Sequence, residues 1–191
     1  MANLDPVAMA MIKKIEADKG KKIKTIKPGQ KPPLGSMLVF RYIAKHKQKL
    51  DVWDAMPASI VLGHYSDGFL AINTHYLPYL KRLNLAERLL RATKNKNRIT
   101  YRKLKKALKG LQLPLAYANF MLKRYLNNHI TSAKIYVFTF EDYKEFLVNI
   151  PPKFQKRTDK FAFAAVTQAF RAHVKASKGK KVRNTNVKRK K

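Results

Sequence analysis

Two apolar runs joined by a tight-turn signal constrain the fold of this chain more than any other feature. Residues 59–65 read SIVLGHY, residues 69–73 read FLAIN, and Ser66-Asp67-Gly68 separates them. Asp-Gly between two apolar runs is the strongest short-range signal for a β-hairpin. This segment therefore predicts two neighbouring antiparallel strands.

Further short strands are expected around this hairpin. Over residues 37–44 both alternating sets of side chains are largely apolar, which indicates a strand that is covered on both faces. Residues 50–53 predict another short strand, which Pro57 interrupts, and residues 135–138 (IYVF) predict one more. Short strands joined by short turns predict a small antiparallel sheet or an SH3-like partial barrel over about residues 37–73.

A short amphipathic helix is expected near the N-terminus. Asp5 is a good N-cap, Pro6 suits the first helical position, and Gly20 would end the helix. This helix either packs on its own domain or is a detachable anchor that docks on a partner. The basic, Pro- and Gly-containing residues 21–33 predict a linker or arm.

The chain after Pro78 is predicted to be mainly helical. Apolar side chains recur there three to four residues apart, and Thr100 and Thr139 are suitable N-caps. Helices are expected over residues 80–90, 101–110, 114–127, 140–150 and 158–176. The predicted fold class is thus α+β, with a helix and basic linker over residues 1–36, a core domain over 37–176 and a basic tail over 177–191.

The charge of the chain is strongly unbalanced. It carries 42 Lys and Arg against 11 Asp and Glu, a formal net charge of +31, whereas a small soluble domain needs a charge of only about 2–8. Such an excess repels itself in the folded state unless a polyanion lies nearby. Nucleic acid is the usual polyanion, and a membrane surface is the alternative. No apolar run approaches 18 residues, so no segment is expected to span a bilayer.

The cations are concentrated in two regions. Residues 81–109 hold 12 of them against one acid, Glu87, and residues 153–191 hold 14 against one acid, Asp159. Solvated helix faces normally mix both signs, whereas the helix expected over residues 101–110 has no acid. This helix, the residues just before it and the C-terminal tail are therefore predicted to contact phosphates of double-stranded DNA. Tyr101 could stack on a base, and inward packing is the favoured expectation. No zinc finger, RNP1 motif or basic zipper occurs, which predicts little sequence readout. The predicted nucleic-acid-binding residues are Lys94, Lys96, Arg98, Arg102, Lys103, Lys105, Lys106, Lys109, Lys178, Lys180, Lys181, Arg183, Lys188, Arg189, Lys190 and Lys191.

The sequence offers little for catalysis. It has no Cys, its five His lack metal-ligand spacing, and it contains no phosphate-binding loop or nucleophile elbow. One nuclease arrangement is open, in which Asp142 and Lys144 join a carboxylate from Asp51, Asp54 or Asp67 to hold Mg²⁺. The first turn of a helix also explains Asp142, because acids there favour the helix dipole. The chain is therefore expected to be no enzyme and to bind no metal or cofactor.

One ordered string of residues goes beyond these general patterns. It reads K-x-K-L-x-x-W-D-x-x-P-x-x-I-x-L over residues 47–62, followed by Asp-Gly-Phe-Leu over 67–70 and Asn-x-His-Tyr-Leu-Pro over 73–78. With this string, residues 38–90 resemble a family of proteins from T4-like tailed bacteriophages that is associated with DNA end protection. The family often has Tyr where this chain has Val52, and Gly where it has Ala71-Ile72. The resemblance implies a structural role for Trp53, Asp54, Pro57, Asp67, Gly68, Phe69, Asn73, His75, Tyr76 and Pro78.

The resemblance also implies a virion protein that is made late in infection and works beside the packaged genome. Together with the charge, it predicts a protein that binds double-stranded DNA at or near the genome end, in the host cytoplasm during assembly and later in the virion. The alternative is a structural neck, tail or baseplate subunit. In that case basic arms at both ends of the chain would dock on acidic neighbouring subunits.

Overall fold

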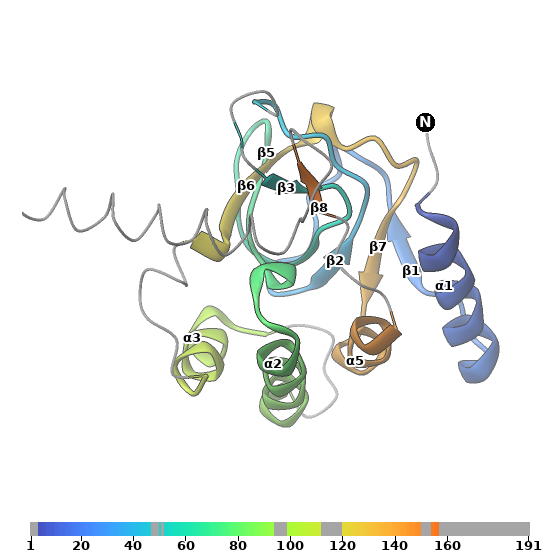
Figure 1. Ribbon diagram of the computed structural model, residues 1–191, viewed down its shortest axis with the longest axis vertical. Coiled ribbons are helices and arrows are strands. Elements are labelled where there is room, and N and C mark those ends of the chain that lie inside the picture. The colour runs from blue at the N-terminus through green and yellow to red at the C-terminus, as the bar shows by residue number, and fades with distance from the viewer. Residues whose placement is uncertain are drawn as a thin grey trace, which may run out of the picture.

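The computed structural model describes residues 4–46, 50, 52–93, 99–111, 120–149 and 154–156 of the 191-residue chain. Antiparallel strands form a six-stranded sheet in the order β1-β7-β2-β4-β5-β6, and β3 pairs with β8 in a second sheet (Figure 1). The strands are β1 (Lys24–Ile26), β2 (Met37–Val39), β3 (Val52–Asp54), β4 (Ala58–His64), β5 (Gly68–Asn73), β6 (Leu122–Leu126), β7 (Ile135–Phe138) and β8 (Phe154–Lys156). The helices are α1 (Pro6–Lys19), η1 (Thr74–Tyr76), α2 (Tyr79–Thr93), α3 (Tyr101–Lys109), η2 (Asn127–His129) and α5 (Phe140–Asn149).

The predicted hairpin is the centre of the large sheet. Strands β4 and β5 pair directly, with a register shift between Val61 and Gly63. Gly68 is required at the start of β5, because a Cβ there would collide with the backbone carbonyl of Tyr125 on β6. The φ of Gly68 is not positive, so the long-range approach of β6, rather than the turn conformation, is what requires glycine here.

Side chains on both faces of the large sheet are buried, as the apolar residues 37–44 predict. One face carries Met37, Val39 and Ile60 and packs against all four α-helices of the described region. The other face carries Phe40 and Phe69 and packs in a separate aromatic cluster. Figure 1 shows α3, α2 and α5 side by side below the sheet.

The α+β prediction is confirmed, and the sheet is larger and more open than a small barrel. It extends past residues 37–73 because β6 and β7 from later in the chain join it. Strands β1 and β6 form its two edges and are not paired with each other, so the sheet does not close.

The N-terminal region belongs to this core. Asp5 accepts a hydrogen bond from the backbone N–H of Val7, and Gly20 ends α1 in the left-handed conformation, as predicted. Met11, Ile12 and Ile15 of α1 are buried, so the helix packs on its own domain. The segment predicted as a linker or arm contains β1, which pairs with β7 at the edge of the sheet.

One predicted helix is wrong over its second half. Residues 122–126 were expected to continue a helix from 114, but they form β6 and pair with β5. Leu122 and Tyr125 have helical spacing, yet pairing with the open edge of β5 outweighs that local preference. Residues 112–119 lie outside the described part of the chain, as do the predicted helix 158–176 and the tail 177–191.

Candidate nucleic-acid interface

The charged side chains on the outer face of helix α3 are all cationic. Its Thr100 cap accepts a hydrogen bond from the backbone N–H of Lys103, and Gly110 follows its last turn. Leu104 and Ala107 anchor the helix in the core. Its five basic side chains are all exposed and it contains no acid. These exposed residues are Arg102, Lys103, Lys105, Lys106 and Lys109.

A groove of about 650 Å³ lies between α3 and α2. The two helices lie next to each other on one side of the sheet (Figure 1). Four cations and one acid line the groove, so its field is positive. Its lining residues are Asn84, Glu87, Arg88, Arg91, Ala92, Lys103, Lys106 and Ala107.

Some of these charged groups already have protein partners. Glu87 accepts a 3.3 Å bond from the Lys144 ammonium, which reduces its effect on the groove. Lys103 Nζ donates to the carbonyl of Ala92 at 2.9 Å. This carbonyl lies at the C-terminal end of α2, where the helix dipole stabilises a cation. Arg88 Nε donates to Asn84 at 2.7 Å.

Other cations point to solvent without such a bond. Among the described residues no hydrogen bond or ion pair engages the side chains of Arg91, Arg102, Lys105 or Lys106. All four side chains are exposed. An exposed ammonium or guanidinium that lacks an acidic neighbour is available to a phosphate oxygen.

The structure brings only part of the predicted set together. The five predicted residues of α3 lie on one helix face, whereas Lys94, Lys96, Arg98 and the tail residues from Lys178 to Lys191 lie outside the described residues. Arg88 and Arg91 were missed, although their spacing of three on α2 places both on its outer side. The tyrosine expected to pack inward, Tyr101, is 65% exposed, because Leu104 and Ala107 already supply the buried face of α3.

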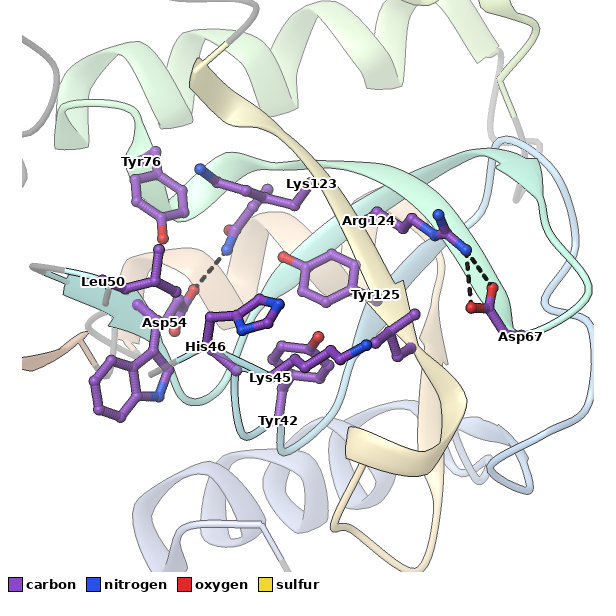
Figure 2. A pocket seen from close by; sticks show the side chains of 14 residues that line it. Tyr42, Lys45, His46, Leu50, Asp54, Asp67, Tyr76, Lys123, Arg124 and Tyr125 are labelled. Atoms are coloured by element: carbon purple, nitrogen blue, oxygen red, sulfur yellow. Dashed lines mark hydrogen bonds and ion pairs between the residues drawn. The ribbon is translucent and has the colours of Figure 1, made fainter. Parts of the chain in front are cut away.

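A second pocket, of about 450 Å³, opens on the other side of the large sheet, where β6 passes the segment that leads to β3 (Figure 2). Aromatic side chains supply much of its wall, and basic side chains from separate segments accompany them. Its lining residues include Tyr42, Lys45, His46, Leu50, Trp53, Asp54, Asn73, Tyr76, Lys123 and Tyr125.

A buried polar network forms the base of this pocket. Asp54, which is 3% exposed, accepts hydrogen bonds from the backbone N–H of Met56 at 3.0 Å and from Asn73 Nδ2 at 2.9 Å. Its Oδ2 also lies 2.9 Å from His75 Nδ1, and Asn73 Oδ1 accepts from the backbone N–H of His75. The structural role predicted for Asp54, Asn73 and His75 is therefore confirmed.

Lys123 is the unusual group of this pocket. Its ammonium lies 4.5 Å from the ring centroid of Tyr76 and 4.6 Å from that of Phe120. Burial lowers the pKa of Lys123 to about 8, and none of the described carboxylates forms an ion pair with it. Residues 114–127 were predicted to be helical, so sequence reasoning could not place Lys123 beside Tyr76.

The carboxylates considered for a nuclease have separate partners. Asp142 accepts a 2.6 Å bond from Lys19, and its backbone N–H donates to Thr139 at the start of α5. Asp67 forms a bidentate pair with Arg124 at 2.7 and 2.8 Å. Within the described residues no group of three or more His, Cys, Asp or Glu is arranged to hold a metal ion. Asp51 lies outside those residues.

Comparison with protein families identifies a match over most of the chain. The family model described as "Phage T4 terminal DNA protecting protein" matches residues 11–170. Neither the curated proteins nor the solved structures contain a match to this chain. In the described part of the chain, every helix is too short or too polar to cross a membrane.

Proposed function

The chain belongs to the phage T4 terminal DNA protecting protein family, and from this premise we propose that it binds the ends of linear double-stranded DNA through phosphate contacts. The observation that supports this most is the groove between α2 and α3, where four cations face one acid. That acid, Glu87, is already bonded to Lys144. The cations of the groove would therefore attract a phosphate backbone, and little acidic charge remains there to repel it.

The contact would position DNA without reading its sequence. Lys and exposed Arg side chains on a helix face bind phosphates at any sequence, whereas base readout needs side chains that enter a groove in fixed geometry. A bound protein of this kind would shield a DNA terminus by occupying it. We propose that it does so without catalysing a reaction, in the virion and during its assembly, with neck or tail proteins as further neighbours.

The first test is a salt titration of binding to blunt linear duplex. If about eight phosphates are engaged, log K falls against log salt with a slope of about −7. Arg91→Gln with Lys106→Gln removes two exposed cations that have no described protein partner, so the slope becomes shallower by about 2. The matched control is Lys13→Gln with Lys14→Gln on exposed positions of α1, at the other end of the helical layer (Figure 1).

The second test measures protection. Linear duplex is incubated with the protein and then with an exonuclease that digests from ends, and surviving full-length DNA is quantified. The native chain and the α1 control should protect, and the groove variant should need a higher concentration. A salt slope near zero, with no protection, would refute the proposal and leave the structural neck, tail or baseplate subunit as the better account.

A further inference from the structure

The pocket beside β6 has a composition that the groove does not share. Trp53, Tyr42 and Tyr76 contribute aromatic surface, and Lys123 and Lys45 contribute positive charge. Its volume of about 450 Å³ lies within the range of about 300–1,000 Å³ that is usual for small-ligand sites. Aromatic surface next to cations is the combination that holds nucleotides, because rings stack on bases and cations bind phosphates.

The position of Lys123 points to an anionic ligand. Lys123 and Tyr125 lie two residues apart and therefore on the same face of β6, and Figure 2 shows both beside the pocket. The Lys123 ammonium contacts the rings of Tyr76 and Phe120, and no described carboxylate pairs with it. A cation removed from water without an acidic partner is a favourable site for an incoming phosphate.

The depth of the two lysines indicates which phosphate each can reach. Lys123 is only partly exposed and lines the pocket together with the buried Asp54 and Tyr76, whereas Lys45 is exposed. A phosphate at Lys123 would lie against these buried side chains, a position that suits the end of a strand. A phosphate at Lys45 can belong to the next nucleotide outside.

We propose that this pocket binds the terminal nucleotide of a DNA strand, with its terminal phosphate on Lys123, its base against Trp53 and the next phosphate near Lys45. The choice of DNA as the source of the nucleotide rests on the proposed function above. The pocket and the groove share none of their lining residues, so the proposal for the pocket and the proposal for the groove can be refuted separately.

The chain carries a built-in probe for this pocket. Trp53 is the single Trp of the sequence and lines the pocket, so its fluorescence reports on occupancy at that place alone. The native chain is titrated with a short single-stranded oligonucleotide that carries a terminal phosphate, with the same oligonucleotide lacking it, with a free deoxynucleoside monophosphate and with inorganic phosphate. Stacking of a base on Trp53 should quench the emission.

The phosphorylated oligonucleotide should bind most tightly, and the one without a terminal phosphate about 10- to 100-fold more weakly, as expected for the loss of a charge-assisted bond. Lys123→Met should cause the same loss. Lys45→Met changes an exposed residue that the fold does not need, so it should fold normally and weaken the oligonucleotide a few-fold while sparing the free monophosphate. The groove variant Arg91→Gln with Lys106→Gln should bind the phosphorylated oligonucleotide like the native chain.

Several results would overturn the proposal. Equal binding with and without the terminal phosphate, or binding that is unchanged in both Lys123→Met and Lys45→Met, would do so. Equal quenching by inorganic phosphate would reduce the pocket to a simple anion site, and a free monophosphate that binds as tightly as the oligonucleotide would make it a nucleotide site unrelated to DNA ends. If only the groove variant lost duplex binding while no ligand quenched Trp53, the proposed function would stand and the pocket would not.

Discussion

Replacement of Lys123 by Met should stabilise the protein at neutral pH. Burial lowers the pKa of Lys123 from 10.5 to about 8, and a shift of that size corresponds to an unfavourable free energy of about 3 kcal/mol for the charged form in the folded state. The rings of Tyr76 and Phe120 offset about 1–2 kcal/mol of this through cation–π attraction. Methionine keeps an unbranched apolar side chain against the same rings, so Lys123→Met should raise the unfolding free energy by about 1–2 kcal/mol at pH 7.

The extra stability of the Lys123→Met protein should disappear as the pH rises. Since the folded-state pKa of Lys123, about 8, lies below its unfolded value of 10.5, the unfolded native chain binds more protons between these two values. The native chain therefore gains stability relative to Lys123→Met between these two pH values. The full cost of burying the charged Lys123 in the native chain is present only below about pH 8. Urea denaturation of both proteins at pH 7, 8, 9 and 9.5 gives the difference at each pH, and contributions from groups common to both proteins cancel.

Lys45→Met is the matched control, because it makes the same change at an exposed residue of the same pocket. Its effect on stability should be small and should not vary over this pH range. A Lys123→Met protein that is less stable than the native chain at pH 7, or a difference that is equal at pH 7 and 9.5, would refute the account of Lys123 as a buried cation held without a carboxylate.

Three further substitutions test other parts of the structure by urea denaturation. Asp54→Ala should lower the unfolding free energy by about 3 kcal/mol, because it leaves buried donors of Asn73 and of the Met56 backbone unsatisfied. Burial alone would raise the pKa of Asp142, but hydrogen bonds from Lys19 and Thr139 hold this pKa below its ordinary value. Asp142→Asn should therefore lower the unfolding free energy at pH 7. The difference from the native chain should vanish as the pH falls through the folded-state pKa of Asp142. Thr100→Ala removes the N-cap of α3 and should cost about 1 kcal/mol; no loss would argue against the cap.

Local signals predicted the elements that depend on neighbours in sequence. Asp67-Gly68 set the β4–β5 hairpin, and Asp5 and Thr100 marked the starts of α1 and α3. In each case the deciding interaction spans only a few residues, such as the side-chain bond from a cap to the first helical turn. The cationic face of α3 was predictable for the same reason, since helical spacing alone separates its exposed cations from Leu104.

The features that the sequence did not predict depend on distant contacts. Strand β6 has helical spacing and became a strand because the free edge of β5 accepts it. The same pairing brings Lys123 to Tyr76, and no short-range pattern contains that contact. A structural role was predicted for Asp54, Asn73 and His75, but their contacts were not, because Asp54 joins two distant segments of the chain around its own carboxylate.

A protein that protects DNA ends must solve a problem of competition, because each end is accompanied by a long duplex interior. The exposed cations between α2 and α3 would bind both equally well, since phosphate contact carries no positional information. Occupancy of an end depends on the ratio of the affinities for ends and for duplex interior, weighed against the number of interior sites. End binding therefore needs a second contact, outside the groove, that favours termini. The terminal-nucleotide pocket proposed around Lys123 would supply it, because it would hold the last phosphate of a strand against buried side chains. On this argument, adding closed circular duplex in excess should remove a Lys123→Met protein from a DNA end far more readily than it removes the native chain.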